Sequence, residues 1–397
     1  MPDFKTPVLG FDQNFPNHAL IDAATLFDGE SFRHNTRLEI RDDRIVALHA
    51  RGGDAGGLPL LTLPEGCILA PGFIDTQVNG GGDVLLNDAP SLESVQRIAR
   101  AHRRFGTTGL LPTLITDSPE KLAALASCAE QSLALPGVLG FHLEGPFLNI
   151  ARKGIHPVSW IRQPNPENIE ALKRFGAIGR SLVTLAPETM PSTVLDTLAQ
   201  SGLRLAIGHS EANAEEALSA IEHGVTGVTH LYNAMSQLSA RAPGIVGAAF
   251  ADPRLIAGII CDGLHVAPLA LRAAFKAMGP ERVMLVTDAM STAGGRAGGF
   301  ELDGKTILLR DGKLTDAQGT LAGAHLTMID AVQNAVEMMG ASLADALIMA
   351  SRTPARFLGL DASLGRIAPG FQADLVAFDG RDILTTWIAG ERLGILG

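Results

Sequence analysis

Three side chains that could together hold a metal ion follow separate apolar segments of this 397-residue chain. Glu144 lies between an apolar run and Gly145-Pro146, while His209 and His230 each end an apolar run of their own. Two imidazoles and one carboxylate are the ligands of many catalytic zinc sites, in which a fourth position stays open for water. We therefore predict a hydrolytic metal centre made of these three residues. His142, one layer deeper on the same run as Glu144, is either a further ligand or a satisfied buried histidine.

A second carboxylate, Asp288, ends the apolar segment 284–287 and could move protons. A carboxylate close to a metal-activated water can take a proton from that water and later give it to a leaving amine. The structural alternative for an aspartate at such a position is an N-cap of the helix that follows. We predict the catalytic role for Asp288.

Other polar residues near these segments could bind the substrate. His265 follows a further apolar segment, and His156 stands in a loop pattern, where a surface histidine is the alternative interpretation. Backbone N–H groups at a turn, together with a guanidinium, can form a phosphate site. Asn233 and Ala234, followed by Arg241, offer such a combination.

The residues that carry this chemistry stand at the ends of expected strands of a parallel barrel. The expected strands, which alternate with helical segments, are 68–76, 109–113, 138–143, 181–185, 204–207, 227–229, 255–260 and 282–287. Eight strands close a (β/α)8 barrel, and the active sites of such barrels lie at the carboxyl ends of the strands. An open doubly wound sheet is disfavoured because its Gly-rich dinucleotide fingerprint is absent. The predicted fold class is therefore α/β, of the TIM-like barrel type.

Both ends of the chain show a different pattern, in which polar and apolar residues alternate between turns. Such alternation is typical of β-strands with one buried face. We expect residues 1–69 and 365–397 to form one small β-sandwich from both chain ends, and residues 70–364 to form the barrel. Two Asp-Gly turns predict a β meander inserted into the barrel at about residues 294–323.

The composition disfavours several other classes of protein. The formal charge of −10 comes without a clustered basic run, so we expect no nucleic-acid partner. The 3 cysteines are far apart and lack CxxC spacing, which argues against a disulfide framework and fits the reducing cytoplasm. The first residues do not have the pattern of a signal peptide. No apolar run reaches the roughly 18 residues of a membrane helix, so we expect no membrane partner.

Several segments in order along the chain carry a family resemblance. The most discriminating are His142–Pro146 and His230–Met235. The others are Pro71–Asp75, Gly208–Ser210, Asp262–His265 and Thr287–Met290. With these segments, the chain resembles the N-acetylglucosamine-6-phosphate deacetylase family of the amidohydrolase superfamily from about residue 19 to the C-terminus.

The resemblance implies a reaction and a metal centre. The reaction is hydrolysis of N-acetyl-D-glucosamine 6-phosphate to D-glucosamine 6-phosphate and acetate, in amino-sugar catabolism or recycling. Glu144, His209 and His230 match the metal ligands of the family, and Asp288 matches its general base and acid. One divalent metal ion per chain is implied, with zinc as the expected ion and Fe²⁺, Co²⁺ or Mn²⁺ as alternatives.

The resemblance also implies contacts with the sugar phosphate. His265 and His156 would contact the sugar and the amide oxygen. Asn233, Ala234 and Arg241 match the phosphate-binding positions, and the arginine often reaches across the interface of a homodimer. A homodimer is therefore an expectation from the resemblance.

Gln77 and Asn79 depart from the pattern of most amidohydrolases, which place a His-x-His pair there to hold a second metal ion. Both side chains point to the same face of one strand, because side chains alternate along a strand. Amides are poor zinc ligands beside imidazole, so we expect this second-metal position to be vestigial.

Alternatives to this function remain on the same scaffold. The protein could deacetylate another N-acetylhexosamine 6-phosphate or another N-acyl amine. Ala324 and His325 replace a smaller pair in the family's substrate loop, and a histidine beside the sugar could change the preference at carbon four or the preference for the acyl group. A catalytically inactive sugar-phosphate sensor is disfavoured, because a binding protein needs neither a metal nor a proton carrier.

Overall fold

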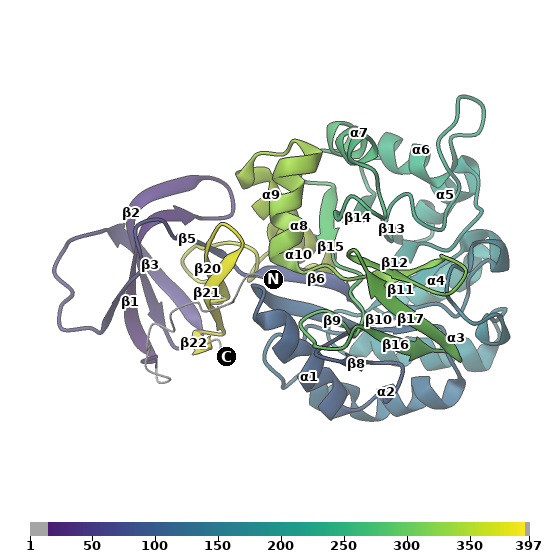
Figure 1. Ribbon diagram of the computed structural model, residues 1–397, viewed down its shortest axis with the longest axis horizontal. Helices are drawn as coiled ribbons and strands as arrows, with labels where there is room; N and C mark the ends of the chain where they lie inside the picture. The colour runs from purple at the N-terminus through teal and green to yellow at the C-terminus, as the bar shows by residue number, and fades with distance from the viewer. Residues whose placement is uncertain (1–14, 394–397) are drawn as a thin grey trace.

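The structure, a computed structural model, describes residues 15–393 and contains a large barrel beside a smaller β unit (Figure 1). The barrel strands, in chain order, are β6 (Phe73–Val78), β9 (Thr107–Ile115), β10 (His142–Glu144), β11 (Leu182–Leu185), β12 (Arg204–Ile207), β13 (Val225–Val228), β14 (Ile256–Ile260) and β15 (Val283–Val286). Their order in the sheet follows their order in the chain, and every hydrogen-bonded pair is parallel. The predicted (β/α)8 barrel is confirmed.

Helices cover the outside of the barrel, both between successive strands and after the last one (Figure 1). They are α1 (Leu92–Arg103), α2 (Pro119–Ser132), α3 (Pro166–Lys173), α4 (Ser192–Gln200), α5 (Ala214–Glu222), α6 (Gly244–Ala251), α7 (Pro268–Met278), α8 (Met328–Asn334), α9 (Leu343–Ala350) and α10 (Arg352–Leu358). Side-chain caps start many of them. The Ser118 hydroxyl, for example, accepts a hydrogen bond from the backbone N–H of Lys121. In the described part of the chain, no helix is long and apolar enough to cross a membrane.

The first and eighth barrel strands, β6 and β15, meet without a regular ladder. The backbone N–H of Asp288 donates to the carbonyl of Gln77 across this seam, at 3.0 Å. The buried carboxylate of Asp75 accepts hydrogen bonds from both the backbone N–H and the hydroxyl of Thr287. These contacts place the end of β6 directly beside the residues that follow β15.

The smaller β unit is built from both ends of the chain, as expected. Its strands are β1 (His18–Phe27), β2 (Phe32–Arg41), β3 (Arg44–Ala50), β4 (Leu60–Thr62), β5 (Ile68–Pro71), β20 (Leu375–Asp379), β21 (Asp382–Ile388) and β22 (Glu391–Leu393). β20 pairs antiparallel with β5, which joins the two ends in one sheet around its own apolar core. Residues 1–14 and 394–397 of the expected terminal segments lie outside the described residues.

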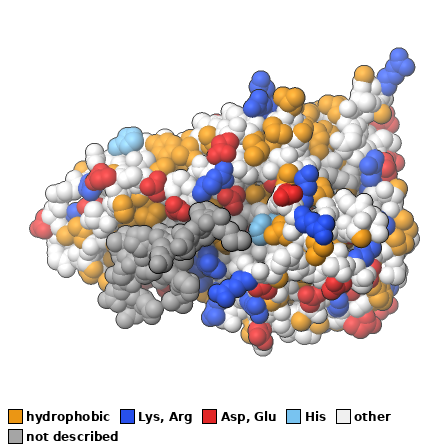
Figure 2. Space-filling model, viewed as in Figure 1, with side chains coloured by type: hydrophobic (Ala, Val, Ile, Leu, Met, Phe, Trp, Pro, Cys, Tyr) orange, Lys and Arg blue, Asp and Glu red, His pale blue; other side chains and the backbone are white. Residues whose placement is uncertain are grey.

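Acidic and basic side chains are interspersed over the face shown in Figure 2.

A four-stranded antiparallel meander follows β15, in the region of the predicted insertion. It consists of β16 (Gly299–Leu302), β17 (Lys305–Arg310), β18 (Lys313–Thr315) and β19 (Leu321–Ala324). Its last strand returns to the barrel, where the backbone N–H of Ala324 donates to the carbonyl of Asp288 at 2.9 Å. The end of the meander therefore lies over the mouth of the barrel.

A buried carboxylate at the start of β20 makes the stability of the protein depend on pH. Asp374 accepts hydrogen bonds from the backbone N–H of Ala389 and the side chain of Gln372. Burial raises the pKa of Asp374 from its ordinary 3.8 to about 6. The native state therefore binds this proton more tightly than the unfolded chain does, and stability is lost as the pH rises through the folded pKa.

Asp374→Asn removes the charge and keeps an oxygen that can accept the same hydrogen bonds. We expect the variant to gain free energy of unfolding relative to the wild type as the pH rises from about 4 to about 7, by up to about 3 kcal/mol. Denaturant titration of both proteins across this range measures the difference. If the free energies of unfolding of the two proteins changed with pH in the same way, ionisation of Asp374 would not destabilise the native state.

Candidate active site

Four acidic or imidazole side chains lie where separate barrel strands end. Glu144 is the last residue of β10, and His209, His230 and Asp288 each follow the end of β12, β13 and β15 by two residues. Because the carboxyl ends of parallel strands all face the same end of the barrel, the four side chains meet at its mouth. The structure therefore brings these four predicted site residues together.

The backbone turns sharply at three of these residues. The φ angles of His209, His230 and Asp288 are 50°, 32° and 50°, in the left-handed region that residues other than glycine rarely adopt. Such conformations cost on the order of 1–3 kcal/mol each and persist only where the surrounding structure holds them. Here a hydrogen bond from the backbone N–H of Leu231 to the carbonyl of Gly258, at 2.7 Å, holds the turn beside His230.

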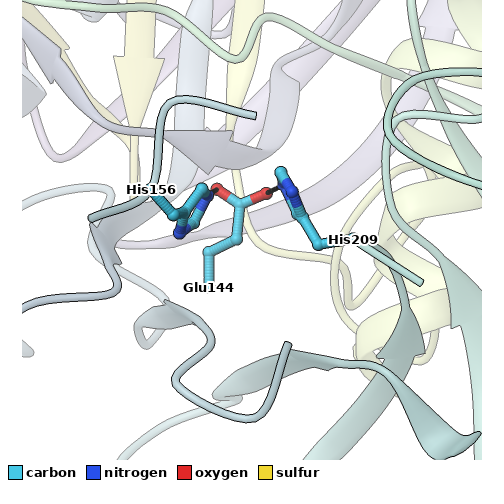
Figure 3. A group of neighbouring side chains, drawn as sticks. All are labelled: Glu144, His156 and His209. Atoms are coloured by element: carbon cyan, nitrogen blue, oxygen red, sulfur yellow. Dashed lines mark hydrogen bonds and ion pairs between the residues drawn. The ribbon is translucent and has the colours of Figure 1, made fainter. Parts of the chain in front are cut away.

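The Glu144 carboxylate is the centre of a buried cluster of imidazoles. Its Oε1 atom lies 3.2 Å from Nε2 of His209 and 3.0 Å from Nε2 of His230, and these two nitrogens lie 3.1 Å apart. Its Oε2 atom faces Nε2 of His156 at 4.0 Å. Figure 3 shows Glu144 between His156 and His209, with one carboxylate oxygen directed toward each ring. All four side chains are buried.

The protonation pattern of this cluster suits a cation. Nδ1 of His209 lies 2.8 Å from the carbonyl oxygen of Arg152, which can only accept, so Nδ1 carries a proton. In the neutral ring, Nε2 then directs a lone pair toward Glu144. Either a further proton or a metal ion must lie between Nε2 and the carboxylate. A hydrogen bond from the other ring nitrogen to a backbone carbonyl, as His209 makes to Arg152, is typical of metal-binding histidines. The donor set therefore fits a divalent metal ion.

The pKa shifts within the cluster point the same way. Burial raises the pKa of Glu144, but hydrogen bonds from His209 and His230 outweigh burial and hold it well below its usual range. Burial lowers the pKa of His230, yet the hydrogen bond and charge of Glu144 raise it above its usual value. Burial also holds the pKa of His156 well below its usual range. The centre of the cluster thus attracts positive charge.

Asp288 lines the same cavity as the cluster and is held by two side-chain amides. Nε2 of Gln77 donates to Oδ1 of Asp288 and to Oε1 of Glu144, both at 3.1 Å. Nδ2 of Asn79 donates to the same Oδ1 atom at 2.6 Å. Burial and the charge of Glu144 raise the pKa of Asp288 to about 6. A carboxyl group with such a pKa suits proton exchange near neutral pH.

A cavity of about 210 Å³ contains most of the predicted site residues. Those that line it are Asn79, Glu144, His156, His209, His230, Asn233, Ala234, His265 and Asp288. A larger groove of about 500 Å³ between α2 and α3 touches Glu144 but none of these histidines. The smaller cavity is therefore the site in which the chemistry of these residues can act together.

His142 and His265 are both fixed by hydrogen bonds, in different settings. His142 lies below the cluster, where its ring bonds to the hydroxyls of Thr113 and Thr184, and burial lowers its pKa to about 4. It is a satisfied buried histidine, the second of the two interpretations left open above. Nδ1 of His265 lies 2.6 Å from Oδ2 of Asp262, and this hydrogen bond orients the ring, which lines the cavity.

The predicted phosphate-binding residues are only partly together. Asn233 and Ala234 line the cavity, and Ala234 has a left-handed φ of 49°. Arg241 is exposed in the loop before α6 and does not line the cavity. His325 is also exposed, bonds to the hydroxyl of Thr292 and is not among the residues that line the cavity.

Sequence reasoning missed two contributions to this site. Leu321 and Gly323, at the end of the meander, line the cavity, although their sequence carries no signal of such a role. Gln77 and Asn79 were expected only as a vestigial metal position, whereas both donate hydrogen bonds within the site. Their spacing revealed that they share a face, but the acceptors come from strands far away in the sequence.

Comparisons with known proteins agree on one family. The amidohydrolase family model matches residues 68–393. The N-acetylgalactosamine-6-phosphate deacetylase of Shewanella sp. (strain ANA-3) is 45% identical over 94% of this chain and 95% of its own length. The N-acetylglucosamine-6-phosphate deacetylase of Haemophilus influenzae is 36% identical over 79% and 83% of the two chains. The solved N-acetylglucosamine-6-phosphate deacetylase from Pasteurella multocida superposes with a TM-score of 0.91 at 34% identity, over 95% of this chain and 100% of that one.

Proposed function

The chain belongs to the amidohydrolase family, and we propose from this premise that it hydrolyses N-acetyl-D-glucosamine 6-phosphate to D-glucosamine 6-phosphate and acetate. The observation that carries the proposal is the buried group of Glu144, His209 and His230, which faces Asp288 within one cavity. Relatives named for this activity cover most of the chain, including those from Haemophilus influenzae and Mus musculus, each at 36% identity. The reaction breaks the C–N bond of a linear amide.

In this proposal Glu144, His209 and His230 hold one divalent metal ion. Zinc is the expected ion, and Fe²⁺, Co²⁺ or Mn²⁺ are alternatives. His230 is preferred to His156 as the third ligand because its Nε2 atom lies 3.0 Å from a Glu144 oxygen, compared with 4.0 Å for His156. A metal ion held by these three residues would supply Lewis acidity, which would polarise the amide carbonyl and make water more acidic.

Asp288 moves the proton that this reaction requires. Its carboxylate takes a proton from the attacking water and gives it to the amide nitrogen, because an unprotonated amine is too poor a leaving group. The water oxygen bonds to the carbonyl carbon, the C–N bond breaks, and the nitrogen leaves as the amine of the sugar while the acyl group is released as acetate. His156 and His265 lie on the same cavity and are assigned to the amide oxygen and the sugar.

The phosphate is assigned to the turn at Asn233 and Ala234, whose position in the cavity supports this role. Arg241 is exposed and does not line the cavity of its own subunit. We therefore assign it to a homodimer interface, where it would bind the phosphate of the substrate in the cavity of the partner subunit. A cytoplasmic location completes the proposal, and it is supported by the free state of all 3 cysteines.

A second candidate substrate is N-acetyl-D-galactosamine 6-phosphate, the epimer at carbon four. One observation favours it: the Shewanella relative named for this activity is 45% identical to the chain, compared with 36% for the Haemophilus relative named for the glucosamine activity. The chemistry at the amide is the same for both sugars, so the proposed roles of the site residues do not change.

Acetate release by the zinc-loaded protein tests the function. N-acetylglucosamine 6-phosphate is compared with its unphosphorylated form and with N-acetylgalactosamine 6-phosphate. We expect the first sugar to exceed the unphosphorylated form in kcat/KM by about 10²-fold or more, because charge-assisted contacts bind the phosphate. Arg241→Ala should reduce this preference without affecting the unphosphorylated sugar. A higher kcat/KM for the galactosamine epimer would favour the second candidate, and no acetate from any sugar would refute the proposal.

A further inference from the structure

The two carboxylate oxygens of Asp288 differ in their hydrogen bonds, because only Oδ1 accepts hydrogen bonds from other residues of the range 15–393. Oδ1 accepts hydrogen bonds from Nδ2 of Asn79 at 2.6 Å and from Nε2 of Gln77 at 3.1 Å. Among the described residues, no side chain or backbone group donates to Oδ2. We propose that the side-chain amides of Gln77 and Asn79 form an amide clamp, which fixes Oδ1 of Asp288 and presents Oδ2 to the reacting water and amine. This inference rests on the proposed deacetylation.

The chemistry of the amides suits this role. A primary amide nitrogen carries two N–H donors, and an ionised carboxylate can only accept. Gln77 uses its two donors on different carboxylates, one on Asp288 and one on Glu144. It thereby bridges two like charges that would otherwise repel each other in a buried site. The clamp fixes the distance between the proposed metal ligand and the proposed proton carrier.

The fold gives the clamp its rigidity. Gln77 and Asn79 are 2% and 3% exposed and stand two residues apart, so their side chains share one face of the chain at the end of β6. The backbone hydrogen bond from the N–H of Asp288 to the carbonyl of Gln77 fixes the position of both amides along the barrel axis relative to Asp288. The orientation of the Asn79 amide is also determined, because a flipped amide would place its carbonyl oxygen against the carboxylate.

A positioning role makes a different prediction from a merely structural one. Asn79→Leu has nearly the same volume but lacks the donor, and we expect it to lower kcat by about 10–100-fold, the usual effect of a lost hydrogen bond to a charged group. KM, the melting temperature and the content of one zinc ion per chain should stay close to wild type. Asn79→Asp, which keeps the shape but not the donor, should be at least as damaging.

Gln77→Leu should lower kcat by a similar factor and, in addition, weaken zinc affinity about tenfold, because Gln77 also holds Glu144. Asn87→Leu is the matched control. Asn87 is equally buried, at 3% exposure, but its amide donates to the Ile115 carbonyl and to Asp117 instead of Asp288. Its loss should lower the melting temperature and leave kcat within about twofold of wild type.

Normal kcat in Asn79→Leu or Asn79→Asp would overturn the clamp. So would a loss of kcat that is matched by an equal loss of bound zinc or of folded protein. If the wild-type protein itself released no acetate, the proposed function would fail separately. The clamp would then be judged on zinc affinity alone, and unchanged affinity in Gln77→Leu would reject it.

Discussion

Asp288→Asn is expected to lower kcat by about 10³-fold or more, because the amide cannot take a proton from water or deliver one to the amine. The replacement keeps the shape of the side chain and an oxygen that can accept hydrogen bonds from Gln77 and Asn79. Metal content should stay at one ion per chain, and substrate binding measured by calorimetry should be retained. The loss therefore appears in turnover and not in affinity.

A carboxylate outside the cavity provides the control for this variant. Asp117 pairs with Lys121 at 2.9 Å and does not line the cavity. Asp117→Asn should keep kcat within about threefold of wild type, as expected for a partly exposed ion pair. Near-normal turnover in Asp288→Asn would refute the role of Asp288 as the proton carrier.

His230→Ala is expected to remove the bound metal ion and to lower kcat/KM by about 10³-fold or more, since the metal supplies several kcal/mol of transition-state stabilisation. His156→Ala should keep one metal ion per chain and affect only catalysis and substrate affinity. Metal analysis after gel filtration, combined with steady-state kinetics, separates the two variants. The comparison is sharp because both rings are buried and both face Glu144.

The reverse outcome would change the assignment. Loss of metal in His156→Ala together with retention in His230→Ala would make Glu144, His156 and His209 the ligand set, a group whose ligand atoms also lie within 4.8 Å of one another. Retention in both variants would exclude either histidine as an essential ligand. His142→Gln serves as a further control, because His142 lies below the cluster and its ring bonds to the hydroxyls of Thr113 and Thr184.

Much of the site could be predicted because strand ends are visible in a sequence. Glu144, His209, His230 and Asp288 each end an apolar run, and a closed parallel barrel brings the ends of all such runs to one mouth. The number of runs and the turn residues between them fixed the fold class. The geometry then follows from topology and needs no knowledge of individual contacts.

The remaining features depend on contacts that no local pattern encodes. The role of Gln77 and Asn79 follows from the closure of β6 against β15, strands that lie at opposite ends of the barrel sequence. His156 comes from an irregular loop between β10 and α3, yet its ring lies 4.3 Å from that of His209. The meander, which could be recognised as an insertion, gave no sign that Leu321 would line the cavity.

The proposed single zinc site is tested most directly by a zinc titration of the metal-stripped protein, with acetate release from N-acetylglucosamine 6-phosphate as the readout. We expect no turnover without metal and a linear rise that ends at one zinc ion per chain, since the proposed ligands Glu144, His209 and His230 would make a single site and the amides of Gln77 and Asn79 are poor ligands. Turnover in the stripped protein, or a rise that continues to two zinc ions per chain, would contradict it.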